Sequence, residues 1–167
     1  MSAPVLAPRF VQVAWVVRDI DAAEAFFKKI MGVPKFLQLR NLKAKDTNGT
    51  YKGQPADWVI HLSIAYAGDT QIELIQPVSG ASMYQEWIDQ HGGDGVQHVA
   101  YWLDDADYDA AAAHLTGAGF PLVQSFSLPM ARIGYFDTRA AIGVVTEIVG
   151  ATAAGHLFRD NIKTGNF

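Results

Sequence analysis

The pattern of hydrophobic and polar positions repeats once along the chain. Residues 12–27 and 98–113 coincide when the sequence is shifted by 86 positions; each begins with an apolar run, continues through an acidic turn and ends in an alanine-rich stretch. Apolar residues of the last stretch recur at helical spacing, as in Ala23, Phe26 and Phe27. Each unit is therefore predicted to be a strand followed by a helix, and the repeat indicates two structurally equivalent halves.

Turn-forming residues divide the rest of each half into strands. Glycine, proline and aspartate separate three strand-like segments after each predicted helix. These segments are residues 35–40, 58–67 and 70–76 in the first half, and 122–128, 133–137 and 144–149 in the second. Both halves thus have the order β-α-β-β-β, and the polar, lysine-rich stretch 41–55 is expected to be a loop.

These patterns predict an α+β fold made of two tandem βαβββ modules. The expected boundaries are 8–77 for the first module, 78–95 for a linker with a short helix, 96–150 for the second module and 151–167 for a C-terminal tail without clear periodicity. Two modules of this size form one domain overall, over residues 8–150.

Composition excludes several classes of protein. Half of the 167 residues are apolar and 18% are charged, which is typical of a folded globular chain rather than a disordered one. The net charge is −4 and the basic residues are scattered, so no nucleic-acid partner is expected. The sequence has no cysteine, which excludes disulfides, thiol nucleophiles and zinc-thiolate sites.

The apolar runs are too short to span a bilayer, so no membrane partner is expected. The N-terminal residues MSAPVLAPRF do not have the basic and apolar regions of a signal peptide. We therefore expect a cytoplasmic protein.

Four polar residues interrupt apolar strands at equivalent positions of the two halves. Gln12 and His98 lie on the first strands, and Glu73 and Glu147 lie on the last. A buried carboxylate without a partner is costly, so these groups are expected to be protonated or paired. One amide, one imidazole and two carboxylates together suit a divalent ion with open coordination positions, namely Ni, Co, Mn, Mg, Fe or Zn.

Each of these residues also has a purely structural explanation. Gln12 is typical of a strand edge, His98 of a hydrogen-bonded core histidine, and Glu73 or Glu147 of a partner for arginine. The shared metal site is favoured because the duplication makes the positions equivalent.

The sequence resembles the vicinal oxygen chelate superfamily, which has the glyoxalase fold. The stretches that carry the resemblance are residues 11–27, 71–77, 98–113 and 135–149, and together they cover about residues 8–150. The superfamily includes glyoxalase I, methylmalonyl-CoA epimerase, extradiol dioxygenases and the fosfomycin- and bleomycin-resistance proteins. The resemblance implies a cupped mixed sheet around one divalent metal ion, with metal ligands at Gln12, Glu73, His98 and Glu147.

The ligand set implies a particular kind of chemistry. Glutamine, glutamate, histidine and glutamate are the ligands of one branch of glyoxalase I, while the segments at residues 73–77 and 95–100 resemble the epimerase branch. Both enzymes remove a proton α to a carbonyl and stabilise the resulting enediolate or enolate at the metal. By this resemblance, Glu147 is the principal general base and Glu73 the second acid/base of a lyase or isomerase.

Two alternatives remain open at this point. The first is a resistance-type protein that binds a small molecule without turnover, although such a protein has no need of two buried glutamates. The second is a ring-cleaving dioxygenase, which Gln12 argues against because that branch has histidine at this position.

The substrate is less well defined by the sequence. The candidate substrate-binding residues are His61, Trp102, Tyr135 and Arg132. A thioester or glutathione adduct would need cations, which Arg40, Lys43, Lys45 and Lys52 near the expected loop would supply. We also expect a homodimer, because dimerisation protects exposed sheet edges; modules paired within one chain or exchanged between two are both compatible with the linker.

Overall fold

The computed structural model describes residues 6–167; Met1–Val5, the start of the segment in which no signal peptide is expected, lie outside the described residues. The first half contains the short helix η1 (Ala7–Arg9), β1 (Phe10–Val16), α1 (Ile20–Lys29), β2 (Leu37–Lys43), η2 (Ala44–Asp46), β3 (Thr50–Tyr51), β4 (Gln54–Pro55), β5 (Val59–Ala67) and β6 (Thr70–Ser79). The second contains α2 (Met83–His91), β7 (Gly95–Asp104), η3 (Asp105–Asp107), α3 (Tyr108–Gly117), β8 (Leu122–Leu128), β9 (Ala131–Phe136), α4 (Arg139–Ile142), β10 (Val145–Ala151) and α5 (Ala153–Thr164).

A single mixed sheet of ten strands forms the centre of the molecule, which confirms the predicted fold class. The strand order is β2-β5-β6-β1-β7-β10-β9-β8-β3-β4. The two halves meet where β1 and β7 pair antiparallel, with Val13 opposite Val99. Each of these strands also pairs in parallel with the last long strand of its own half, β1 with β6 and β7 with β10. The four strands with the candidate ligands are therefore neighbours at the middle of the sheet.

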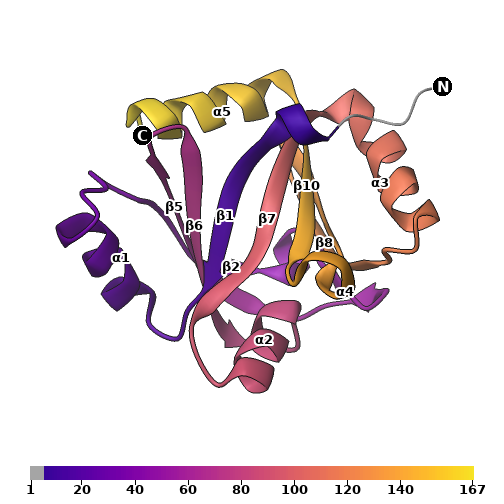
Figure 1. Cartoon of the computed structure of the whole chain (residues 1–167), viewed down its shortest axis with the longest axis horizontal. Coiled ribbons are helices and arrows are strands. Elements are labelled where there is room, and N and C mark those ends of the chain that lie inside the picture. The colour runs from indigo at the N-terminus through magenta and orange to yellow at the C-terminus, as the bar shows by residue number, and fades with distance from the viewer. Residues whose placement is uncertain (1–5) are drawn as a thin grey trace.

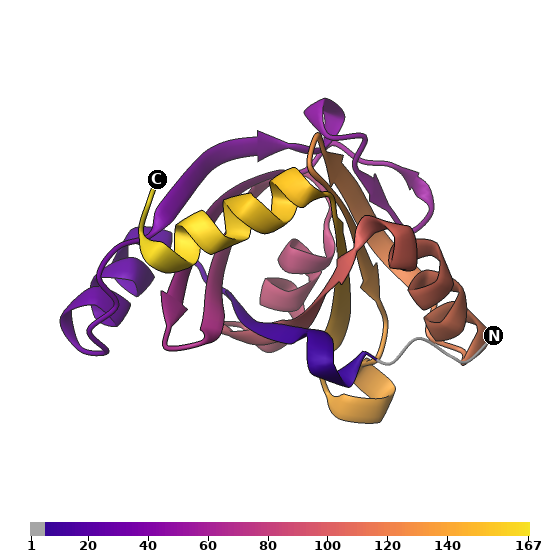
Figure 2. The same cartoon turned by 90° about the horizontal axis from the view of Figure 1, so that it is seen from above.

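The sheet curls into a deep cup, as the view in Figure 2 shows. β2 lies at one edge of the strand order, yet β3, only a few residues later, pairs with β8 near the other edge. The segment 41–55, expected to be a loop, thus holds the end of β2, η2 and a short hairpin that joins the two sides of the cup. The polar composition of this segment gives no strand pattern in the sequence, because its strands are defined by long-range pairing rather than by an apolar period.

Helices α1 and α3 pack outside the cup, one beside each half (Figure 1). The side chain of Asp19, in the acidic turn, accepts a hydrogen bond from the backbone N–H of Ala22 at 2.9 Å and caps the N-terminus of α1. In the second half η3 takes the place of a side-chain cap before α3. Apolar residues of the two helices bury the outer faces of the neighbouring strands, while a third apolar cluster fills the inside of the cup.

The C-terminal segment forms α5, which lies across the opening of the cup (Figure 2). Near the C-terminal end of α5, Lys163 forms an ion pair with Asp69 in the β5–β6 turn, with 2.7 Å between Nζ and Oδ1. At its other end Gly155 packs so closely that an added Cβ would lie 2.5 Å from the carbonyl oxygen of Met130. The segment without clear periodicity is thus an ordered cover for the cup.

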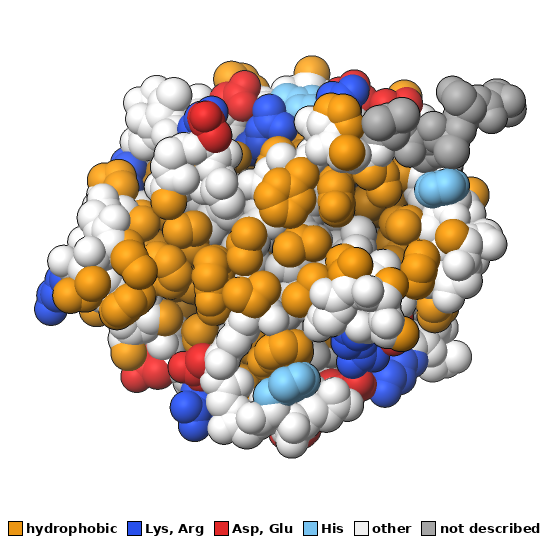
Figure 3. All heavy atoms as spheres, in the orientation of Figure 1, with side chains coloured by type: hydrophobic (Ala, Val, Ile, Leu, Met, Phe, Trp, Pro, Cys, Tyr) orange, Lys and Arg blue, Asp and Glu red, His pale blue; other side chains and the backbone are white. Residues whose placement is uncertain are grey.

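A broad band of apolar side chains covers the outer face of the central strands, as Figure 3 shows. On β1 the inward residues are buried, whereas Val13 and Trp15, which point outward, are only half-buried. Val99 and Tyr101 of β7 are similarly half-buried. Among residues 6–167, no helix has the length and hydropathy needed to cross a membrane.

Candidate functional site

Four buried polar side chains meet inside the cup. Nε2 of His98 lies 3.1 Å from Oε2 of Glu73 and 3.1 Å from Oε2 of Glu147. The amide nitrogen of Gln12 donates hydrogen bonds of 3.1 Å to the same two oxygens. None of the four residues is more than 5% exposed. The duplication predicts that Gln12 is equivalent to His98 and Glu73 to Glu147. The structure brings both pairs together within one chain.

Strand alternation explains this convergence. Gln12 is the register partner of Gln71 on β6, and Glu73 follows two residues later on the same face. His98 lies opposite Ala14 on β1 and pairs with Val145 on β10, two residues before Glu147. All four side chains therefore point from adjacent strands to the concave side of the sheet.

The charges of the cluster are strongly coupled. Burial disfavours the charged imidazole, but hydrogen bonds and charge from Glu147 and Glu73 outweigh it and raise the pKa of His98 to about 9. Burial also raises the pKa of Glu73, although His98 and Gln12 act in the opposite direction. In the protein without a bound cation, an imidazolium thus supplies the positive charge between the two glutamates.

The donor atoms fit a divalent cation. One ligand atom each from Glu73, His98 and Glu147 lies within 4.8 Å of the others, which is the spacing of atoms around a shared ion. Gln12 turns its N–H group toward the carboxylates, so its Oε1 would face the ion after rotation of the amide. Oxygen and nitrogen donors with two negative charges suit the ions predicted from the sequence.

Gln97 holds the ring of His98 from the other side. Its Oε1 lies 2.6 Å from Nδ1 of His98, and the Gln97 side chain is buried. The pairing of β1 with β7 shifts here, because Ala14 lies opposite His98 while Trp15 lies opposite Val96. The resulting β-bulge leaves Gln97 unpaired in the ladder and lets it reach its neighbour. With Nδ1–H bonded to Gln97, Nε2 faces the cluster.

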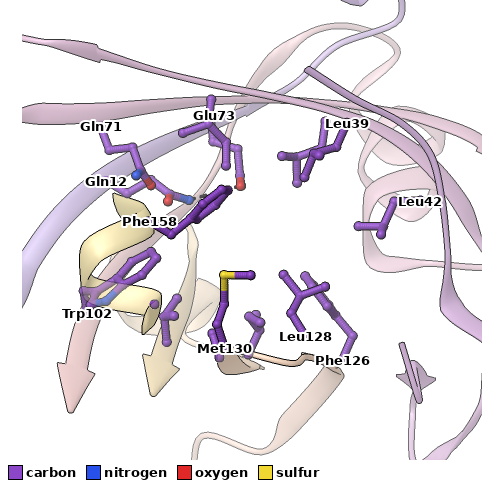
Figure 4. A pocket seen from close by; sticks show the side chains of 16 residues that line it. Gln12, Leu39, Leu42, Gln71, Glu73, Trp102, Phe126, Leu128, Met130 and Phe158 are labelled. Atoms are coloured by element: carbon purple, nitrogen blue, oxygen red, sulfur yellow. Dashed lines mark hydrogen bonds between the residues drawn. The ribbon is translucent and has the colours of Figure 1, made fainter. Parts of the chain in front are cut away.

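A pocket opens beside the cluster (Figure 4). Gln12, Gln71 and Glu73 form its polar wall, and Phe158 of α5 lies next to them. The other lining residues are Leu39, Leu42, Leu62, Ile64, Trp102, Phe126, Leu128, Met130, Ala131, Ile133, Val149 and Gly155. A largely apolar pocket with a few convergent polar groups is typical of a small-molecule site.

The four candidate substrate-binding residues lie in different places. Trp102 is part of the pocket wall. Tyr135 is buried behind the cluster, where its ring packs edge-on against the imidazole of His98 with 5.2 Å between centroids. The structure does not bring the other two residues, His61 and Arg132, to the pocket.

Strand direction explains the positions of these two residues. Leu62 and Ile64 of β5 line the pocket, so His61 points to the opposite face, where Nδ1 accepts a 3.2 Å hydrogen bond from the backbone N–H of Asn41. Arg132 alternates in the same way with its pocket-lining neighbours on β9. Its guanidinium bonds Asp105 at 2.7 Å on the outer side.

Sequence reasoning missed three residues of the site, namely Gln71, Gln97 and Phe158. Gln71 carried an available signal, because it lies two residues before Glu73 and alternation places both on one face. Gln97 carried none, since alternation alone turns it away from His98. Phe158 depends on the docking of α5.

Comparisons with known proteins agree with this architecture. A family model described as the glyoxalase/bleomycin resistance protein/dioxygenase superfamily matches residues 11–133. No curated protein matches the sequence significantly. Among solved structures, a methylmalonyl-CoA epimerase from Mycobacterium tuberculosis has 23% identity and a TM-score of 0.63, with 92% of this chain and 95% of that chain covered.

Two further solved structures have the same fold. A hypothetical protein from Bacillus halodurans has 18% identity and a TM-score of 0.62, over 86% of this chain and 94% of that one. A methylmalonyl-CoA epimerase in complex with methylmalonyl-CoA and an ammonium ion has 22% identity and a TM-score of 0.57, over 88% and 96%. At these identities the likeness concerns the fold.

Proposed function

The chain belongs to the glyoxalase/bleomycin resistance protein/dioxygenase superfamily, and on this basis we propose that it is a divalent-metal-dependent lyase or isomerase that moves a proton next to a carbonyl group. The observation that carries the proposal is the buried cluster of Glu73, His98 and Glu147 beside an apolar pocket. Two carboxylates in such a place need a cation, and they also provide the acid and base for proton transfer.

Gln12, Glu73, His98 and Glu147 hold the metal in this proposal. A bound divalent cation supplies Lewis-acid stabilisation where negative charge develops on the substrate. Gln97 keeps Nε2 of His98 directed at the cluster by accepting the hydrogen bond from Nδ1. The apolar pocket wall excludes water, which strengthens electrostatic interactions at the reacting atoms.

Glu73 and Glu147 form the acid/base pair. Glu73 is part of the pocket wall and is therefore placed to contact the substrate, whereas Glu147 is not among the described lining residues. Glu147, the principal base that the resemblance implies, reaches the substrate carbon only by loosening from the cluster. One carboxylate takes the proton from the carbon and the other returns it, so no net oxidation or hydrolysis is needed.

Two reactions fit this step. One is the glyoxalase type, with the hemithioacetal of glutathione as substrate, and the other is the epimerase type, with a CoA thioester such as methylmalonyl-CoA. Two solved structures with this fold are named methylmalonyl-CoA epimerases, which supports testing the epimerase type first. Both substrates belong in the first screen, with deuterium incorporation at the α-carbon in D₂O as the readout.

Metal content and proton exchange together test the proposal. We expect the purified protein, reconstituted with a divalent ion, to bind one ion per chain, and Glu73→Ala and His98→Ala to lose it. The matched control is His61→Ala, which removes an imidazole on the opposite face of β5 and is expected to retain the ion.

The roles of the carboxylates are tested by Glu73→Gln and Glu147→Gln, which keep the shape of the side chain. Each is expected to slow exchange by about 10²–10⁴-fold while the protein still binds metal. Exchange at the wild-type rate in metal-loaded Glu147→Gln would remove that residue from the acid/base pair.

Binding without turnover is the second candidate function. The largely apolar pocket next to α5 favours it, because such a pocket binds a small molecule whether or not chemistry follows. A protein that binds no metal and still takes up ligand with an affinity unaffected by Glu147→Gln would support this candidate over the enzyme.

A further inference from the structure

Two polar atoms of the pocket lack a partner among the described residues. They are Oε1 of Gln71 and the indole Nε1 of Trp102. The Gln71 side chain is 1% exposed, and its amide nitrogen donates a 3.3 Å hydrogen bond to the hydroxyl of Tyr66. The free atoms are therefore one acceptor and one donor, both in the pocket wall.

Buried polar atoms without partners are uncommon in folded proteins. Gln71 is the register partner of Gln12, so its amide lies next to the cluster of Glu73, His98 and Glu147. Figure 4 shows Gln71, Gln12, Glu73 and Trp102 on one side of the pocket. A buried acceptor without a partner beside the cluster suits a ligand group that donates a hydrogen bond, such as a hydroxyl.

The opposite side of the pocket is apolar. Figure 4 shows Leu39 and Leu42 there, with Phe126, Leu128 and Met130 along the adjoining wall. Aromatic rings and a thioether pack well against a flat ring. The pocket therefore has a polar end at the cluster and an apolar end for a ring-sized body.

The lining contains no lysine or arginine within the described chain. Two of the cations considered for a thioester or glutathione adduct, Arg40 and Lys52, are engaged by acids elsewhere, as is the candidate substrate-binding residue Arg132. Arg40 bonds Glu24 at 3.0 Å, Lys52 bonds Glu86 at 2.8 Å and Arg132 bonds Asp105 at 2.7 Å. An anionic substrate would find no positive partner in the pocket wall, whereas a neutral one needs none.

Helix α5 completes the pocket. Phe158 and Gly155 belong to the wall, and the close approach of Gly155 to Met130 fixes the helix there. Arg159, one residue after Phe158, lies over the ring of Trp102 at 5.5 Å and so holds the indole in place. Phe158 thus limits the space available next to Glu73.

We propose that the pocket takes a small, neutral, ring-bearing α-hydroxy carbonyl compound. Gln71 Oε1 accepts from its hydroxyl group, and the ring lies among the apolar residues. The carbonyl lies next to Glu73, and this part alone rests on the proposed function. The reaction is exchange or relocation of the proton on the hydroxyl-bearing carbon, which needs no other reactant.

Binding to the metal-free protein tests this proposal separately from catalysis. Calorimetric titration in EDTA compares 2-hydroxyacetophenone with acetophenone, which lacks the hydroxyl, and with hydroxyacetone, which lacks the ring. We expect 2-hydroxyacetophenone to bind at least roughly tenfold more tightly than either. Equal affinity for acetophenone, or tighter binding of acetyl-CoA, overturns the proposal.

Two variants connect the preference with the acceptor. Gln71→Leu removes the amide with little change in size and is expected to reduce the tenfold preference to less than about threefold. The matched control is Trp87→Phe, because Nε1 of Trp87 is also buried without a partner but Trp87 is not in the lining. This variant is expected to keep the preference.

A preference that survives Gln71→Leu overturns the assignment of the hydroxyl group. Unfolding curves of all three proteins establish that each variant is folded before titration. If the wild-type protein shows the preference but the reconstituted protein exchanges no α-proton, the proposed function fails while the ligand class stands. If the reconstituted protein exchanges an α-proton but the metal-free protein shows no preference, the ligand class fails while the proposed function stands.

Discussion

Gln97 and His98 are neighbours in β7, yet their side chains meet, with 2.6 Å between Oε1 of Gln97 and Nδ1 of His98. Successive residues of a regular strand point to opposite faces, and the β-bulge between β1 and β7 removes that restriction. The contact directs Nδ1 at Gln97 and leaves Nε2 facing Glu73 and Glu147. A single local irregularity thus orients the histidine within the cluster.

Gln97→Leu is expected to weaken metal binding by about 10–100-fold, because the ring of His98 loses its orienting acceptor. Competition with a chromophoric chelator measures the affinity. Gln97→Glu restores an acceptor and is expected to bind metal at least as well as the wild type. Equal affinity in the wild type and the leucine variant would contradict this positioning role.

Metal binding is expected to release protons. The pKa of His98 is raised to about 9 in the metal-free protein, so its imidazole is charged at neutral pH and must lose a proton to become a ligand. The apparent affinity should therefore rise by roughly tenfold per pH unit below pH 9. Titration calorimetry in buffers of different ionisation enthalpy counts the protons; a flat affinity between pH 6 and 8 would contradict the assignment.

A separate ionic network stabilises the packing of α1 on the sheet. Burial alone would raise the pKa of Glu24, but hydrogen bonds from Ser63, Lys28, Arg40 and Gln38 outweigh it and lower the pKa to about 2. Since the folded-state pKa is below the unfolded value, this contribution to stability is complete above about pH 4.5 and is lost as the pH falls toward 2.

Glu24→Gln is expected to lower the free energy of unfolding by about 2–3 kcal/mol at pH 7. The difference should shrink below pH 4.5, as measured by urea unfolding across the pH range. Asp21→Asn is the control, because Asp21 also bonds Arg40 but its side chain is 84% exposed, and it should change stability by less than about 0.5 kcal/mol. Equal effects of the two substitutions would contradict the role of burial.

The apolar outer face of β1 and β7 is expected to join two copies of the chain. Val13 and Val99 are register partners there, and an apolar surface of this breadth is typical of a subunit interface (Figure 3). Light scattering should give twice the 18.2 kDa of one chain. Val13→Arg should yield monomers, whereas Leu157→Arg, a substitution at an exposed position of α5, should not. A monomeric wild type at high concentration would exclude this dimer.

The sequence was sufficient for the parts of the fold governed by local periodicity. The internal repeat made Gln12 equivalent to His98 and Glu73 equivalent to Glu147; the structure brings these side chains together. The short helix expected at 82–91 is α2, with Ser82 as its N-cap. The helix signal came from residues close together in the chain, and the site signal came from the match between two segments 86 residues apart.

Features that depend on distant contacts were not predictable in this way. β3 exists because Thr50 and Tyr51 pair with β8, and α5 is ordered because Gly155 permits close packing on Met130. His61 and Arg132 show a different kind of error. Their strand neighbours line the pocket, so strand alternation turns both side chains away from it once the pocket is known.

Anomalous diffraction from crystals grown with Zn²⁺ tests whether an amide, an imidazole and two carboxylates share one cation. We expect one strong peak at the metal edge, about 2.0–2.2 Å from donor atoms of Gln12, Glu73, His98 and Glu147. A structure in which the zinc lies elsewhere, while His98 stays hydrogen-bonded to both glutamates, would contradict this expectation.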